Sequence, residues 1–374
     1  MKHFLLTGAT GTIGSALVPR LLADRDTRLT LLVRAPDDAG LAQRAAAMRP
    51  WWGAESADPA RVQLLRGDIS LPRFGLDEAA FDALAGSTSH IVHCAASVKL
   101  TMTLEQARAT AVVPTRTVLD LARRCAAAGR LVKVDLVSTV GVWGRTPGHL
   151  PERALPEGRE FHNTYEAAKW EAERVIGSEG QGLPITVHRP SMVVGERGSG
   201  RVIHFQVFYH LCEFLAGGRT FGVMPELGST RLDTIPVDWV ADAICWASMH
   251  PETAGRIFHL CSGPERAIAL TQLQEQVRQT WKARGRRLPR LVRLDRGLIE
   301  RLVPLIGWFS GAKGRRALRG LAPVLAYLAE DQGFSNPQTA ATLAAAGMPL
   351  PDVDSYLGAV LAYYLDSRAG GAGT

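Results

Sequence analysis

The fold is decided by the stretch Thr7-Gly8-Ala9-Thr10-Gly11-Thr12-Ile13-Gly14, which lies near the beginning of the 374-residue chain. An apolar run at residues 2–6 precedes it, and residues 12–23 follow with apolar side chains at helical spacing. A second β-prone run at residues 28–33 completes a strand-helix-strand unit. Glycines in such a turn let the backbone approach a pyrophosphate, and the helix start supplies oriented N–H groups and a positive dipole end. The stretch therefore predicts a phosphate-binding loop, with a purely structural glycine turn as the alternative.

The alternation of strand-length and helix-compatible segments continues along the chain. Apolar runs follow at residues 62–65, 90–94, 131–137 and 185–188. Repeated βα units imply a parallel sheet with helices on both faces. Residues 35–60, which contain glycine, proline and charges, suggest a surface excursion. We predict an α/β fold with a Rossmann-type doubly wound parallel sheet.

The alternation of strand-length and helix-compatible segments changes after about Pro190, where we expect a smaller, mostly helical substrate lobe. The predicted Rossmann domain spans residues 1–195, with returning elements at about 233–262. The substrate lobe takes residues 196–232 and 263–368, and residues 369–374 form a flexible tail. Helices in this part are expected at residues 203–215, 271–284, 298–309, 323–330 and 353–364.

Composition and cysteine usage are those of an ordinary folded protein. Hydrophobic residues make up 46% and charged residues 21% of the chain, which excludes disordered and fibrous classes. The amino terminus lacks the apolar region of a signal peptide, and no apolar run reaches about 18 residues, so we expect a cytoplasmic protein. Five scattered cysteines without a C-x-x-C pair predict free thiols and no metal site.

The end of the second expected strand, Leu32-Val33-Arg34, bears on the choice of cofactor. NAD enzymes place an acid here for the ribose 2′-hydroxyl, whereas Arg34 can pair with a 2′-phosphate, which favours NADPH. Arg44 is a weaker candidate for the same phosphate, and a solvent-facing Arg34 is the alternative. The Asp68 carboxylate can accept a hydrogen bond from the adenine amino group, while small residues after the fourth expected strand fit a nicotinamide ribose or simply tight helix packing. The cofactor contacts predicted in this half are Gly8, Thr10, Gly11, Thr12, Ile13, Gly14, Arg34, Arg44, Asp68, Ile69, Cys94, Ala95 and Ala96.

The chemical centre is expected in Tyr165-Glu166-Ala167-Ala168-Lys169, which puts a phenol and an ammonium one helical turn apart on one face. A free tyrosine titrates at about 10, and an ammonium together with an oxidised nicotinamide would favour the phenolate. We therefore expect Lys169 to lower the pKa of Tyr165 and to hold the nicotinamide ribose. Upstream, Ser138 and Thr139 end a strand at the edge where such sheets bind ligands. The alternative is a surface tyrosine and lysine, because Y-x-x-x-K also arises by chance.

Together these motifs resemble the extended short-chain dehydrogenases/reductases over about residues 3–262. The resemblance rests on glycines spaced G-x-x-G-x-x-G, the Tyr165 motif, Thr139 followed by Gly144, R-P-x-x-x-x-G from Arg189, and V-D-x-V-A from Val237. It gives Thr139 the catalytic hydroxyl role with Ser138 in reserve, and the cofactor contacts that it adds are Lys169, Pro190, Ser191 and Val193. Within that branch the chain looks most like thioester reductases and fatty acyl-CoA reductases of the male-sterility-type NAD-binding group. The stretches that carry this likeness are residues 32–35, 93–98, 138–140 and, more loosely, 334–347.

The resemblance implies hydride transfer from NADPH to the carbonyl carbon of an acyl thioester, giving an aldehyde or, after a second hydride, an alcohol. Tyr165 and Thr139 would stabilise and protonate the developing oxyanion. Where such enzymes read N-V-x-G-T, residues 111–115 read A-V-V-P-T, so Ala111 replaces a proton-relay asparagine. An apolar wall for the acyl chain, or equally a plain helix core, is expected from Phe205, Phe208, Tyr209, Leu211, Phe214 and Leu215.

Residues 282–319 carry the surplus of the net charge of +7, with twelve Lys and Arg against Asp295 and Glu300. The candidate partners are an acidic carrier protein or coenzyme A phosphates, an anionic membrane surface, and nucleic acid. Nucleic acid ranks last because no nucleic-acid module accompanies the segment, and a solvated helical face with snorkelling arginines is equally consistent. A peripheral membrane location thus stays open beside the cytoplasmic one, as does the oligomeric state.

Two other functions remain open on the sequence. An extended reductase or epimerase acting on a sugar nucleotide or a hydroxysteroid-like alcohol would share the cofactor site, although the aromatic residues and basic helices disfavour a sugar nucleotide. A catalytically silent NADPH-binding scaffold or sensor is suggested by Ala111, whereas Tyr165, Lys169 and Thr139 argue against it.

Overall fold

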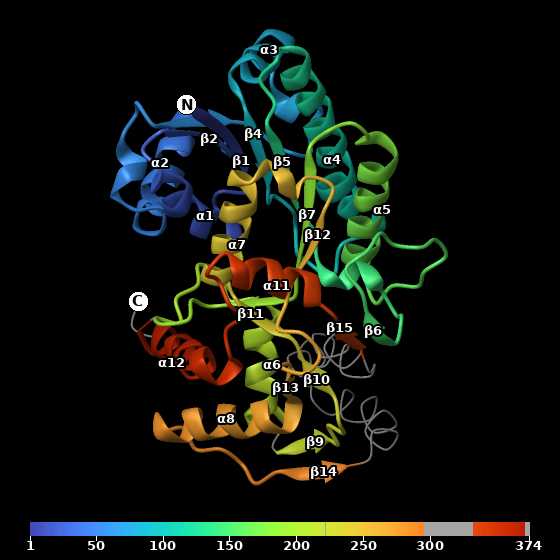
Figure 1. The fold of residues 1–374 in the computed structure, drawn as a ribbon. Coiled ribbons are helices and arrows are strands. Elements are labelled where there is room, and N and C mark those ends of the chain that lie inside the picture. The colour runs from blue at the N-terminus through green and yellow to red at the C-terminus, as the bar shows by residue number, and fades with distance from the viewer. Residues whose placement is uncertain (221, 295–331, 371–374) are drawn as a thin grey trace.

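The computed structural model describes residues 1–220, 222–294 and 332–370. Its centre is a seven-stranded parallel sheet in the order β12-β7-β5-β4-β1-β2-β3 (Figure 1), which confirms the predicted Rossmann-type α/β fold. The order reverses at β1, and ligands bind such sheets beyond the strand ends at this point. The strands are β1 (Lys2–Thr7), β2 (Thr27–Val33), β3 (Val62–Arg66), β4 (His90–His93), β5 (Lys133–Val137), β7 (Ile185–Pro190) and β12 (Ile257–Leu260).

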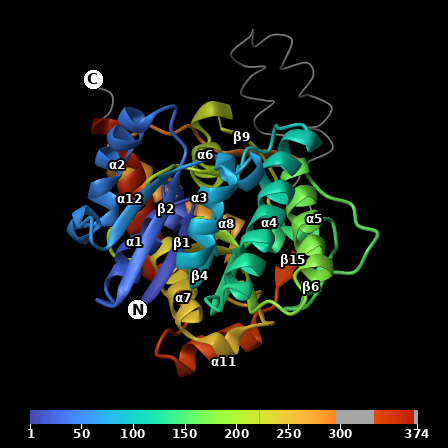
Figure 2. The same cartoon turned by 90° about the horizontal axis from the view of Figure 1, so that it is seen from above.

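Helices cover both faces of this sheet. On one face, α1 (Thr12–Leu22), α2 (Asp38–Trp52) and α7 (Val237–Met249) share an apolar core with the strands. On the other, α3 (Glu78–Ser87), α4 (Leu104–Ala127) and α5 (Thr164–Glu179) share a second core, and Figure 2 shows α4 and α5 side by side. A capping box of Thr103 and Gln106 starts α4.

A separate apolar core lies beyond the carboxyl ends of the strands and joins α6 (Val207–Leu215), α8 (Leu270–Ala283) and α12 (Val353–Gly370). Short α11 (Pro337–Ala345) packs near β12 instead. The sequence does not predict the short strands of this region, because two or three residues are too few for a periodic signal. They form four ladders: β6 (Gly148–Leu150) with β15 (Gln332–Phe334), β8 (Met192–Val194) with β11 (Thr234–Pro236), β9 (Val223–Pro225) with β14 (Val292–Leu294), and β10 (Arg231–Leu232) with β13 (Ile268–Ala269). The predicted domain boundaries stay predictions.

Residues 35–60 are more than the expected surface excursion, because α2 lies within them. The Asp37 side chain accepts a hydrogen bond from the Gly40 N–H at 2.7 Å and so caps the helix. Met48 and Trp52 are buried, and the Trp52 indole N–H donates to the Ala9 carbonyl at 2.8 Å. The helix therefore supports the glycine-rich loop. Most of its other residues are alanine or polar, which hides it from a periodicity search.

Several other boundaries differ from the expected ones. The helix expected at 203–215 begins at Val207, and residues 292–294 form a strand. The expected tail starts inside α12, which ends at Gly370. All five cysteines are free thiols, as predicted. The helices expected at 298–309 and 323–330, residues 295–319 of the basic segment and residues 371–374 lie outside the described residues.

No helix in the described part of the chain combines the length and the apolar character needed to cross a membrane.

Candidate active site

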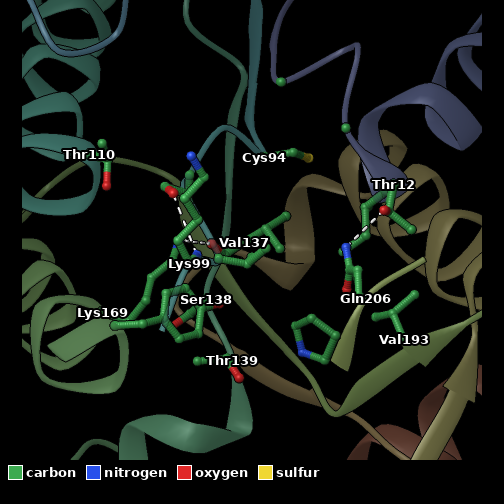
Figure 3. A pocket seen from close by; sticks show the side chains of 18 of the residues that line it. Thr12, Cys94, Lys99, Thr110, Val137, Ser138, Thr139, Lys169, Val193 and Gln206 are labelled. Carbon is green, nitrogen blue, oxygen red and sulfur yellow. Dashed lines mark hydrogen bonds between the residues drawn. The ribbon is translucent and has the colours of Figure 1, made fainter. Parts of the chain in front are cut away.

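A cavity of about 1150 Å³ opens beyond the carboxyl ends of β1, β4, β5 and β7. It exceeds the roughly 300–1,000 Å³ of ordinary ligand pockets, so it has room for a dinucleotide and a substrate. The structure brings all of the predicted site residues to its wall (part of it in Figure 3): Gly8, Thr10, Gly11, Thr12, Ile13, Gly14, Arg34, Arg44, Asp68, Ile69, Cys94, Ala95, Ala96, Ser138, Thr139, Tyr165, Lys169, Pro190, Ser191 and Val193.

The glycine-rich loop is packed backbone to backbone and forms a cradle for an anion. Gly8 has a φ of 79°, and a Cβ there would lie 2.7 Å from the Ala95 nitrogen. A Cβ on Gly14 would lie 2.1 Å from the Gly8 carbonyl oxygen. Gly11 is the N-cap of α1, and because it has no side chain, the first N–H groups of the helix face the cavity uncapped. These features fit the pyrophosphate of a dinucleotide.

Arg34 and Arg44 converge at the end of β2. The Arg34 guanidinium, 72% exposed, lies 3.8 Å from the Asp68 carboxylate, and an Arg44 N–H donates to the Arg34 carbonyl at 2.5 Å. Burial tends to raise the pKa of Asp68, but hydrogen bonds from Ser70 and the Arg34 charge outweigh it, so this pKa is lowered. Two cations and an ionised carboxylate therefore surround the place predicted for the adenosine 2′-phosphate.

The side chains that are predicted to be catalytic meet on the opposite wall. Tyr165 and Lys169 lie on α5, whose N-cap Asn163 accepts a hydrogen bond from the Glu166 N–H at 3.0 Å. The Lys169 ammonium donates to the Val137 carbonyl at 2.8 Å. Thr139 is hydrogen-bonded to the Tyr165 phenol.

The reserve residue Ser138 makes no such contact. Its buried hydroxyl has no hydrogen-bond partner among the described residues. The geometry therefore favours Thr139 for the hydroxyl role.

The pKa of Tyr165 is raised in this structure, so the expected lowering by Lys169 together with an oxidised nicotinamide stays a prediction. Burial is the main cause, and the adjacent Glu166 carboxylate adds to it, whereas the hydrogen bond with Thr139 acts in the opposite direction. The ammonium of Lys169 is directed at a backbone carbonyl instead. A phenol that keeps its proton through neutral pH is suited to act as an acid.

Burial lowers the pKa of Lys169 from 10.5 to about 8, against the opposing influence of Cys94 and Glu173. The side chain is thus an ammonium below about pH 8 and a neutral amine above it. We expect kcat/KM to fall as the pH rises through this value, because the charge that orients the reactants is lost. Lys169→Arg keeps its charge at every accessible pH, so its pH-rate profile should lack this alkaline limb. An unchanged limb in the variant would assign it to another group.

Several polar residues of the cavity have no role in the motifs described above, and the sequence does not identify them. Glu166 is fully buried and pairs with the backbone N–H of His162 at 3.0 Å and with its ring at 2.9 Å. Gln332 donates to two backbone carbonyls in the turn that follows Thr139. Gln206 comes from the start of α6. They are missed because Gln332 and Gln206 lie far along the chain and Glu166 reads as a solvent-facing helix residue.

The position expected for a relay asparagine does not face the cavity. Ala111 is buried in the core under α4, whereas the preceding residue, Thr110, lines the cavity (Figure 3). The Thr110 hydroxyl donates to the Ala107 carbonyl at 3.1 Å. A hydroxyl group therefore stands in the cavity on this turn of α4.

The wall predicted for an acyl chain is a helix core. Phe208, Tyr209, Leu211, Phe214 and Leu215 are at most 3% exposed and pack among α8 and α12. None of them lines the described cavity, and Phe205 packs edge-on against Tyr209. Helical spacing of apolar residues cannot distinguish a core from a ligand wall, and the structure shows the core, which is the second of the two expected alternatives.

Comparison of the sequence with known proteins identifies its relatives. The male sterility protein family matches residues 6–244. An isonitrile lipopeptide synthase from Streptomyces coeruleorubidus is 33% identical over 270 residues, which are 70% of this chain and 18% of that protein. A nonribosomal peptide synthetase from Aspergillus flavus is 32% identical over 269 residues, which are 68% of this chain and 26% of the synthetase. The chain thus spans only a small part of these curated relatives.

Solved structures agree with this relationship. The terminal R domain from the myxalamid PKS-NRPS biosynthetic pathway superposes with a TM-score of 0.81 and 28% identity, covering 100% of this chain and 91% of that one. A UDP-glucuronic acid 4-epimerase from Bacillus cereus shares the fold at a TM-score of 0.66 and 16% identity, with 98% and 99% coverage. The chain belongs to the male sterility protein family of extended short-chain dehydrogenases/reductases, oxidoreductases that use a nicotinamide cofactor.

Proposed function

We propose that the chain is a reductase domain that uses NADPH to reduce an acyl thioester presented by a carrier protein. One observation carries the proposal: the glycine-rich loop and the protonated phenol of Tyr165 line the same cavity. The phenol is hydrogen-bonded to Thr139, and Tyr165 lies one helical turn from Lys169. The likeness to a terminal R domain over the whole chain supports a thioester as the substrate. The synthetase relatives support it as well.

In such a reduction, different residues of the cavity would have different roles. Bound NADPH would supply the hydride that adds to the carbonyl carbon. The hydroxyl groups of Tyr165 and Thr139 donate hydrogen bonds to the carbonyl oxygen, and Tyr165 gives its proton to the oxyanion as it forms. The hemithioacetal then loses its thiol and leaves an aldehyde. Lys169, anchored on the Val137 carbonyl, supplies positive charge beside the reacting groups.

The carrier protein is inferred from a related solved structure that contains a thiolation domain together with a reductase domain. A thiolation-reductase di-domain from an archaeal nonribosomal peptide synthetase has the same fold, with a TM-score of 0.75 and 18% identity over 98% of this chain and 76% of that one. In the described portion of the basic segment, Arg284 pairs with Asp366 at 2.8 Å. Part of the positive charge is thus compensated within the chain, and we propose an acidic carrier as the partner of this basic segment.

NADPH is proposed over NADH because of Arg34 and Arg44. Arg34→Ala should weaken NADPH binding by about tenfold, since a charge-assisted contact to the 2′-phosphate is lost at an exposed site. NADH binding should change by less than about twofold, which fluorescence titration of both cofactors measures. Arg66→Ala, at the exposed end of β3 beside Asp38, removes the same charge outside the cavity and serves as the control. An equal loss for both cofactors in Arg34→Ala would contradict the assignment.

Product analysis tests the reaction itself. The protein is incubated with NADPH and either acyl-carrier-protein thioesters, acyl-coenzyme A thioesters, a hydroxysteroid-type ketone or a sugar nucleotide. We expect aldehyde or alcohol from the thioesters together with NADPH oxidation. Turnover confined to the ketone or the sugar nucleotide would favour the alternative reductase or epimerase. Binding of NADPH without any turnover would favour the silent scaffold.

A further inference from the structure

A hydrogen bond connects the start of α6 to the glycine-rich loop on one side of the cavity. The Nε2 group of Gln206 donates to the Thr12 hydroxyl at 2.9 Å, although 194 positions separate the two residues in the chain. Figure 3 shows the pair facing the cavity on the side opposite Lys169 and Thr139. Both residues line the cavity, yet Gln206 belongs to none of the motifs that mark the cofactor site.

The acceptor of this bond stands at the anion cradle. Thr12 is the first residue of α1, directly after the side-chain-free N-cap Gly11. The N–H groups and the positive end of the helix dipole concentrate there. An amide donor at 2.9 Å from the Thr12 hydroxyl therefore borders the place where pyrophosphate oxygens are bound.

The backbone of Gln206 is held in place by the core behind it. Gln206 is the N-cap of α6 but does not cap it with its side chain, and its carbonyl accepts the Tyr209 N–H at 3.1 Å. Phe208 and Tyr209 are fully buried in the core that joins α6, α8 and α12. Upstream, the Arg201 guanidinium stacks over the Trp51 ring at 4.8 Å. The side-chain amide is thus presented from a fixed backbone, which reduces the entropy lost on binding a ligand.

We propose that Gln206 is a ligand of the cofactor's pyrophosphate, contributed by α6 from outside the sequence motifs. A primary amide carries two N–H donors, so one can remain on Thr12 while the other reaches a phosphate oxygen. Hydrogen bonds to an ionised phosphate are about twice as strong as neutral ones. Because α6 is packed into the core that it shares with α8 and α12, the contact links cofactor binding to the position of the predicted substrate lobe. The inference requires a dinucleotide in the cavity, and it is independent of the thioester and of the 2′-phosphate.

The test measures cofactor affinity in two variants that differ in charge. Gln206→Leu removes the donors, and we expect the Kd for both NADPH and NADH to rise about tenfold. Gln206→Glu can still accept a hydrogen bond from the Thr12 hydroxyl but turns a negative charge toward the phosphates, so its Kd should rise about a hundredfold. Adenosine 2′-monophosphate has no pyrophosphate and should bind the wild type and both variants within about twofold.

The Leu variant decides the matter, because it removes the amide without adding a charge. A Kd for NADPH and NADH within about twofold of the wild type in Gln206→Leu would overturn the inference. A parallel loss of adenosine 2′-monophosphate binding would also overturn it, because the variants would then have damaged the site as a whole. If the wild type reduces thioesters but both variants bind NADPH normally, this inference fails while the proposed function stands.

Discussion

Tyr165→Phe should lower kcat for thioester reduction by about 10³-fold and leave the Kd for NADPH within about twofold of the wild type. The substitution deletes one oxygen atom from a buried side chain that is hydrogen-bonded to Thr139. That atom is both the proton source and a hydrogen-bond donor to the developing oxyanion. Because burial raises the pKa of the phenol, the acid is present throughout the neutral range, and the loss should be equally large from pH 6 to pH 8. Single-turnover NADPH oxidation measures the rate, and fluorescence titration measures the Kd.

The matched control removes the same atom elsewhere. Tyr363 lies on α12 and does not line the described cavity, so Tyr363→Phe should retain wild-type rates. A Tyr165→Phe enzyme that forms aldehyde at a comparable rate would show that another group supplies the proton. Weakened NADPH binding in the variant would instead show that the phenol holds the cofactor more than it serves the reaction.

The sheet and the site were predictable because both are encoded in short segments. Parallel strands buried on both faces read as continuous apolar runs, and the runs at 28–33 and 185–188 match β2 and β7 within two residues. The cradle requires glycine at Gly8 and Gly14 for steric reasons. This requirement is visible in the sequence as the spacing of the glycines. Tyr165 and Lys169 share a helix face by their spacing alone. Local geometry of this kind fixes their placement on one wall.

The remaining features depend on contacts that the sequence does not encode locally. Whether the aromatic residues of α6 face a ligand or a core is decided by α8 and α12, which lie far along the chain. The pKa of Tyr165 depends on how deeply the side chain is buried in the folded protein, because burial is the main cause of its rise. Gln206 reaches Thr12 only because the fold brings the start of α6 to the start of α1. Each of these is a property of tertiary packing.

Gly14→Ala should raise the Kd for NADPH by about a hundredfold or more and lower Tm. A Cβ at this position would lie 2.1 Å from the Gly8 carbonyl oxygen and 2.6 Å from its carbon, and both are backbone atoms that cannot rotate away. The loop must therefore separate from α1, which disperses the N–H groups of the cradle and costs about 1–3 kcal/mol of stability. Gly177→Ala makes the same change in α5, where the methyl group meets nothing within 4 Å, so it should leave the Kd unchanged and stabilise the helix by about 1 kcal/mol. Calorimetric titration and thermal unfolding measure both variants, and a Gly14→Ala protein that binds NADPH normally would place the pyrophosphate somewhere other than this loop.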